Sequence, residues 1–167
     1  MTPTVDAALY RDTFALLAEL ALGLAGFGGV AAAFGGRERS FQATELIRLR
    51  AVFFGGGVVL GGTLVIETLL AIDPLAGSAI RIAGTLSLLA QLVTSATNLR
   101  SAYRRASDPD SSSERWALHL SSLYSLATTV LYVVCILTGQ PWTFIGASTI
   151  QILFSLWMFT RILTRPN

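Results

Sequence analysis

The sequence predicts an all-α protein: a bundle of five transmembrane helices forming one integral membrane domain over residues 1–167. Three observations lead to this class. Hydrophobic residues make up 53% of the chain, and only 13% of its residues are charged, whereas a soluble domain is about 25% charged. The apolar residues fall in five runs of roughly the 20 residues that a membrane-spanning helix needs. Finally, the low charge and the single cysteine argue against a disordered or disulfide-stapled chain.

Each expected helix is bounded by a polar or turn-forming segment. The five runs cover approximately residues 13–35, 51–72, 76–99, 117–138 and 142–160. The four breaks between them are the charged segment 37–50, Asp73-Pro74, the polar segment 100–115 and the turn Gly139-Gln140-Pro141. Five spans place the two termini on opposite sides of the membrane.

The arginines predict the orientation. All 12 basic residues are arginine, and ten of them fall in three segments that five spans place on one side: Arg37, Arg39, Arg48, Arg50, Arg100, Arg104, Arg105, Arg115, Arg161 and Arg165. Because positively charged loops stay in the cytoplasm, we expect the N-terminus outside and the C-terminus inside. We expect a bacterial-type inner (plasma) membrane as the location. The alternative for the first run, a cleaved signal peptide, is disfavoured by its length and by Asp6, Asp12 and Glu19.

Glycines are concentrated in the N-terminal part of the chain, where 11 of the 15 occur by residue 62, ten of them in the first two expected helices. Small residues allow membrane helices to approach closely, so we expect these two helices to pack against each other and to support a homo-oligomer. The packing positions are Gly23, Gly26 and Gly29 on the first helix and Gly57 and Gly61, a G-x-x-x-G pair, on the second. The alternative is a hinge or an unwound, ion-coordinating stretch of the kind found in transporters.

The run AELALGLAGFGGVAAAFGGR, from Ala18 to Arg37, carries an A-E, then A-G-F-x-G, then G-x-R. It resembles the first helix of a group of small bacterial multi-pass membrane proteins of unknown function. The resemblance covers about the first 70 residues and brings no activity with it. It implies that Glu19, Gly26, Phe27 and Gly29 act as a unit.

Three charged residues lie inside the expected spans: Glu19, Glu67 and Arg81. Such residues are costly in a bilayer and usually face a partner or a cavity. Counting from the ends of the runs places all three about 8 to 9 Å deep. We therefore predict a Glu67–Arg81 pair, with Glu19 on the packed side of its helix, either joining the cluster or protonated. The cluster is an ion or proton site in one interpretation and a means of setting helix register in the other.

The third expected helix carries a polar ridge that includes Ser87, Gln91, Ser95 and Asn98. A ridge of this kind suits either a hydrated path or dry hydrogen bonds between helices. The fourth and fifth helices carry milder stripes, which we interpret as packing: Ser121, Ser125, Thr128, Tyr132 and Cys135, then Ser148, Gln151 and Ser155.

The sequence contains no recognisable catalytic or phosphate-binding motif, and its one histidine, His119, lies 16 positions from its one cysteine, Cys135. We therefore expect no enzyme, no metal, no cofactor and no nucleic-acid partner. The leading hypothesis is an oligomeric channel-like or transporter-like protein that passes a small ion or proton. The alternative is a non-conducting accessory or scaffold protein that packs against itself or a larger partner in the lipid bilayer.

Overall fold

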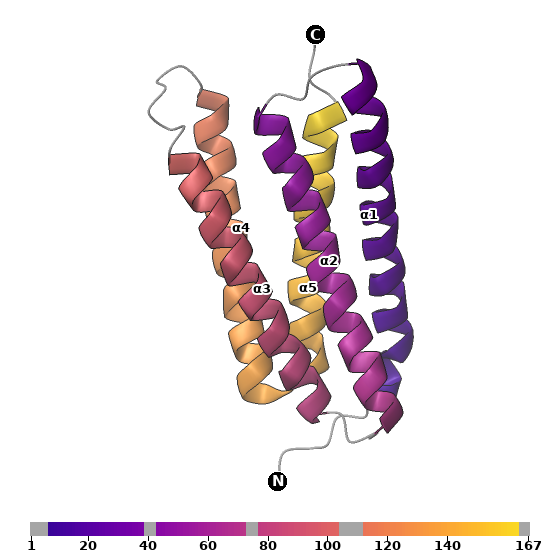
Figure 1. Cartoon of the computed structure of the whole chain (residues 1–167). Coiled ribbons are helices and arrows are strands. Elements are labelled where there is room, and N and C mark those ends of the chain that lie inside the picture. Colours follow the sequence, from indigo (N-terminus) through magenta and orange to yellow (C-terminus); the bar gives the residue numbers. More distant parts are fainter. Residues whose placement is uncertain (1–6, 39–42, 73–76, 104–111, 164–167) are drawn as a thin grey trace.

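A computed structural model describes the chain over residues 7–38, 43–72, 77–103 and 112–163, with some side chains at the helix ends outside the described part (Figure 1). Over these residues the structure is helical and holds no strand. Its elements are the 3-10 turn η1 (Ala7–Tyr10) and the helices α1 (Arg11–Glu38), α2 (Ala43–Ile72), α3 (Gly77–Tyr103), α4 (Ser112–Thr138) and α5 (Pro141–Leu163).

All five helices are long and apolar enough to cross a membrane, so the predicted all-α, five-helix class is confirmed. Each expected run lies within one helix, apart from residue 76, which is outside the described residues; α3 ends at Tyr103 instead of residue 99, and α4 begins at Ser112 instead of residue 117. Helix α2 begins earlier than expected, at Ala43 instead of residue 51. The reason is that segment 43–50 has no glycine or proline to stop a helix, and its leucines and isoleucine favour one.

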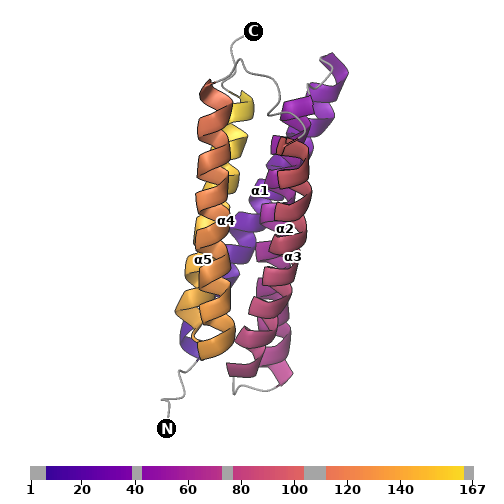
Figure 2. The same cartoon turned by 90° about the vertical axis from the view of Figure 1, so that its left-hand side faces the viewer.

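The helices run up and down, and each packs against the next one along the chain (Figures 1 and 2). Helix α5 contacts all four of the others, most extensively α2 and α4, and α1 lies against α2 and α5. The start of α1 and the end of α5 are therefore at opposite ends of the bundle, as an odd number of antiparallel helices requires.

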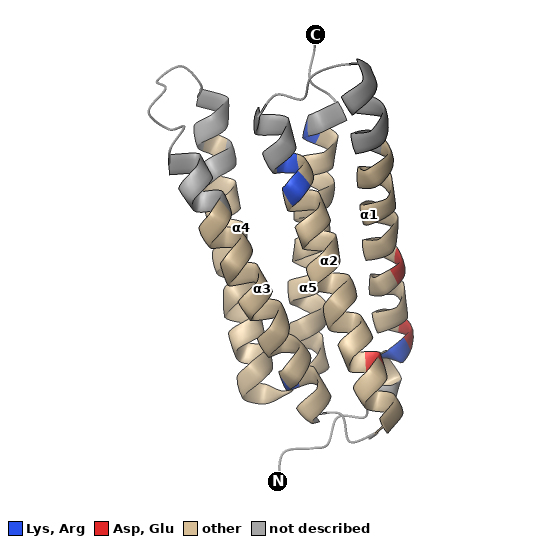
Figure 3. Cartoon of the chain, in the orientation of Figure 1, with Lys and Arg blue, Asp and Glu red and all other residues tan. Residues whose placement is uncertain are grey.

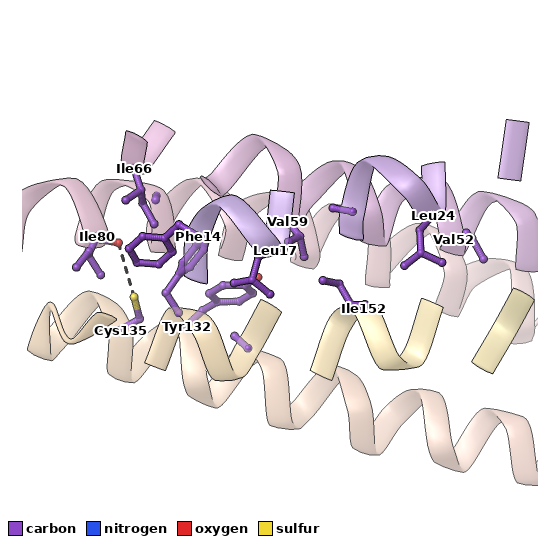
Figure 4. Close-up of a cluster of buried hydrophobic side chains, with 14 residues drawn as sticks. Phe14, Leu17, Leu24, Val52, Val59, Ile66, Ile80, Tyr132, Cys135 and Ile152 are labelled. Atoms are coloured by element: carbon purple, nitrogen blue, oxygen red, sulfur yellow. Dashed lines mark hydrogen bonds between the residues drawn. The ribbon is translucent and has the colours of Figure 1, made fainter. Parts of the chain in front are cut away.

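The core is a column of apolar side chains to which all five helices contribute, α3 through Ile80 and Ala83 (Figure 4). Three aromatic rings meet in this core: the centroid of the fully buried Phe144 ring lies 6.1 Å from that of Phe14 and 6.0 Å from that of Tyr132. The thiol of Cys135 donates to the carbonyl oxygen of Ile80 at 3.6 Å.

The turn between α4 and α5 follows from its sequence. Gly139 has a φ of 68°, a conformation that glycine adopts without strain, and its N–H donates to the carbonyl oxygen of Cys135 at 2.8 Å, which caps α4. Pro141 is the first residue of α5, where its missing N–H costs nothing. The predicted turn is therefore confirmed.

Candidate functional site

The intramembrane charges do not form the predicted cluster. The Oε2 atom of Glu67 accepts a hydrogen bond from Nε of Arg11 at 3.1 Å, so α2 is tied to the start of α1 instead of to α3. The Oε1 atom of Glu67 is buried and has no hydrogen-bond partner among the described residues. Arg11 lies two residues before the run expected for the first helix, so the sequence does not mark it as an intramembrane partner for Glu67.

Arg81 is exposed, and its Nη2 makes a long contact of 3.5 Å with the carbonyl oxygen of Leu137, at the end of α4. The predicted Glu67–Arg81 pair is therefore wrong. Equal distance from a turn gives two residues the same depth, but it does not set the rotation of either helix about its axis. Here Glu67 faces α1, whereas Arg81 lies near α4.

Glu19 is exposed on the surface of α1, which corrects the expectation that it faces the packed side. It lies eight residues beyond Arg11, so it is about 12 Å deeper than the Arg11–Glu67 pair, and the predicted common depth of Glu19 and Glu67 is also wrong. Figure 3 shows the described charges near the ends of the bundle, apart from one acidic turn farther along α1.

Gly23, Gly26, Phe27 and Val30 are exposed with Glu19, and together these five residues are called the outer face of α1. Phe27 is 68% exposed, and no other described atom lies within 4 Å of the place where a Cβ on Gly23 or Gly26 would be. Three of the four residues that the family resemblance groups together, Glu19, Gly26 and Phe27, therefore lie on one face. The fourth, Gly29, is half-buried beside Phe53.

Helices α1 and α2 pack against each other as predicted, but their closest glycine contacts are at Gly28 and Gly56, which were not among the expected positions. A Cβ on Gly56 would lie 3.1 Å from the carbonyl oxygen of Ala21, and a Cβ on Gly28 would touch the Phe53 ring at 3.4 Å. The predicted packing pair on α2, Gly57 and Gly61, has open space instead within the described structure. Of the five expected packing glycines, Gly29 therefore lies in contact with α2, since a Cβ there would be 3.9 Å from Phe53, whereas Gly23, Gly26, Gly57 and Gly61 are open within the described structure.

Gly57 and Gly61 form part of a groove between α2 and α3 with a volume of about 350 Å³. We call it the α2–α3 groove. Its walls include Phe54 and Leu86, which are 54% and 49% exposed, so the groove lies on the outside of the bundle. The buried side chain of Ser87 also lines it. The G-x-x-x-G pair is visible in the sequence, whereas the groove depends on the packing of α2 against α3 and has no sequence signal.

The predicted path residues lie within the protein. Gln91 is 3% exposed, donates to the hydroxyl of Thr128 at 3.3 Å, and accepts at its Oε1 from Nε2 of Gln151 at 3.2 Å. The hydroxyl of Tyr132 donates to Oε1 of Gln151 at 2.9 Å. Hydrogen bonds thus connect α3, α4 and α5. The packing interpretation of the α4 and α5 stripes is confirmed for Thr128, Tyr132 and Gln151.

The remaining ridge positions differ in their surroundings. The hydroxyl groups of Ser95 and Ser125 lie 3.0 Å apart in a hydrogen bond between α3 and α4. The side chain of Asn98 lies outside the described residues. Three buried serine hydroxyls have no hydrogen-bond partner in the described structure: those of Ser87, Ser148 and Ser155.

The described residues contain no group of three or more histidine, cysteine, aspartate or glutamate side chains placed to hold a metal ion. Fold and composition define the class as a helical protein with five helices suited to spanning a membrane. No protein-family model, curated protein or solved structure matches the chain.

Proposed function

We propose that this chain is a non-conducting accessory or scaffold protein of the inner membrane, oriented with its N-terminus outside, which acts by packing the outer face of α1 against another membrane protein. The observation that carries the proposal is the position of Glu19. A charged side chain near the centre of a membrane helix costs at least about 2.5 to 3.5 kcal/mol. On this face the carboxyl is exposed in the isolated chain, so a protein partner that covers it would remove that cost.

The residues around Glu19 support the same conclusion. Gly23 and Gly26 leave the α1 backbone open to close approach, and Phe27 projects beside them. Small residues beside a polar group are typical of contacts between membrane helices. An accessory role also agrees with the hydrogen bonds of Gln91 and Ser95, because side chains that bond to neighbouring helices are occupied by packing.

A photoreactive amino acid at Phe27 tests the proposal in native membranes. We expect it to form a discrete adduct with a membrane polypeptide. The matched control is the same photoreactive residue at Leu123, which is 64% exposed on α4. Equal adducts from both positions, or labelling of lipid alone from Phe27, would refute the proposal.

The second candidate function is movement of a proton or small ion, and the same carboxyl favours it. An exposed carboxyl inside an apolar span exchanges protons when a water-filled contact with a neighbouring subunit reaches it. Purified chain in liposomes separates the two functions. The accessory function predicts the proton flux of protein-free liposomes, whereas a flux that Glu19→Gln abolishes would establish the transport function.

A further inference from the structure

A second carboxyl, that of Asp12, lies in line with the outer face of α1. Asp12 and Glu19 are both exposed and lie seven residues apart, so they point in nearly the same direction and are about 10 Å apart along the helix. Neither carboxyl has a hydrogen-bond or ion-pair partner among the described residues. The adjacent arginine, Arg11, is bonded to Glu67 on α2. The described chain therefore presents two unpaired carboxyl groups on one side of α1.

Glu19 is the deeper of the two carboxyl groups. It lies eight residues beyond Arg11, the exposed first residue of α1, and therefore about 12 Å farther along the helix axis. With the level of Arg11 as the boundary of a hydrocarbon core about 30 Å thick, Glu19 lies within about 3 Å of the middle of that core. A carboxylate at this depth is stable only when another side chain supplies a positive charge or hydrogen bonds.

The surface around Glu19 admits a neighbouring helix. No described atom lies within 4 Å of the place where a Cβ on Gly23 or Gly26 would be, so a second helix backbone can approach closely there. Phe27, which is 68% exposed, adds apolar area beside this opening. A lipid acyl chain also covers apolar side chains, but it has no group that pairs with a carboxyl. A protein helix with a cationic side chain complements both the shape and the charge of this side of α1.

Resting on the accessory function proposed above, we propose that the partner is a membrane helix of another protein that carries an arginine or a lysine at the depth of Glu19. In the low dielectric constant of the bilayer opposite charges attract strongly, and each charge alone is costly. Arginine suits the position best, because it keeps its proton and its two parallel N–H groups bond both oxygens of one carboxylate. Asp12, nearer the membrane surface, favours a basic partner and disfavours an acidic one. A second copy of this chain does not supply such a cation, since the described arginines lie near the two ends of the bundle (Figure 3).

A synthetic membrane peptide tests whether the outer face of α1 selects a cation. Association is measured in phosphatidylcholine liposomes by energy transfer between the purified full-length chain, labelled at its C-terminus, and a leucine–alanine peptide with uncharged ends. One peptide has arginine at its centre, within about 3 Å of the depth of Glu19 in either orientation, and the reference peptide has leucine there. We expect the arginine peptide to bind at least about tenfold more tightly, because its charge is unpaired when it is alone in the bilayer. Equal binding of the two peptides would overturn the proposal.

Variants of the chain locate the contact. Glu19→Gln should abolish the preference for the arginine peptide, whereas Glu19→Asp, which keeps the carboxylate, should retain it. The matched control combines Glu19→Gln with Val130→Glu, which moves the carboxyl to a 51% exposed position eight residues from the end of α4, as Glu19 is eight residues from the start of α1. Tight binding to this control would show that charge alone suffices and would overturn the assignment to α1. Circular dichroism checks that each variant remains helical.

The photoreactive residue at Phe27 separates this inference from the accessory function in native membranes. Its adduct should be lost in Glu19→Gln and retained in Glu19→Asp. The polypeptide in the adduct, identified by mass spectrometry, should carry an arginine or a lysine inside a membrane span. An adduct that Glu19→Gln leaves unchanged, or a polypeptide whose spans hold no basic residue, would overturn the cationic partner while the accessory function stands. The absence of any adduct from the unsubstituted face would refute the accessory function, and this inference with it.

Discussion

Two adjacent glycines on α2 should respond in opposite ways to the same substitution. A Cβ on Gly62 would lie 2.7 Å from Cζ of Phe144 and 2.7 Å from Oγ of Ser87. Phe144 is fully buried, with aromatic rings on two sides, and cannot shift without disturbing the core. Overpacking of this kind costs about 1 to 3 kcal/mol. The gain in helix propensity from glycine to alanine, about 1 kcal/mol, offsets part of this, and the expected net loss for Gly62→Ala is up to about 2 kcal/mol.

Gly61→Ala is the matched control, because a Cβ there meets no described atom within 4 Å. It should leave the free energy of unfolding unchanged or raise it by up to about 1 kcal/mol. Both are measured by reversible unfolding in mixed micelles with increasing dodecyl sulfate, followed by circular dichroism at a dilution that keeps the protein monomeric. Equal effects of the two variants, or a more stable Gly62→Ala, would refute the packing of α2 against α3 and α5 described above.

Three further predictions concern the hydrogen bonds, the ion pair and the orientation. Gln151→Leu removes hydrogen bonds to α3 and α4 and should cost about 1 to 2 kcal/mol in the same unfolding assay; no loss would mean that the buried network does not stabilise the bundle. A double-mutant cycle between Arg11→Ala and Glu67→Gln should give a coupling below about 1 kcal/mol that shrinks with added salt, because the arginine is 61% exposed; a larger, salt-independent coupling would contradict this. Ser112→Cys should not react with an impermeant thiol reagent in intact cells, because this residue is expected on the cytoplasmic side. The unsubstituted chain, whose one cysteine, Cys135, is buried, is the control for background labelling. Rapid reaction of Ser112→Cys would show the opposite orientation.

Residue patterns predicted the helices well because each helix is a local structure. The long apolar runs and the Gly139-Gln140-Pro141 turn depend on neighbours in the chain, and the structure places both where expected. Two helices begin earlier than expected, α2 at Ala43 and α4 at Ser112, because charged and polar residues at the end of an apolar run are compatible with a helix. The arginines mark the polar end of an apolar run, but arginine favours the helix and does not end it.

The candidate site was predicted in part. The polar ridge of α3 could be predicted because residues spaced by three and four lie on one face of a helix, whatever the rotation of that helix about its axis. The spacing does not decide whether Gln91 faces water or protein; in the structure its side chain is buried and hydrogen-bonded to Thr128 and Gln151. The prediction of a Glu67–Arg81 pair was wrong because residue counts give the depth of each side chain along the bundle but not the direction in which it points from its helix axis.

The sequence alone determined the class of the protein, its five helices, their approximate bounds and the residues able to carry polar contacts, because hydropathy and helical periodicity are properties of local segments. Only the tertiary structure decided which face of each helix is covered. Glycines are equally compatible with a contact inside the bundle and with an open surface. The rotation of α1 and α2 packs Gly28 and Gly56 and leaves Gly23, Gly26, Gly57 and Gly61 open. That rotation depends on how all five helices fill one core, so it cannot be read from any one of them.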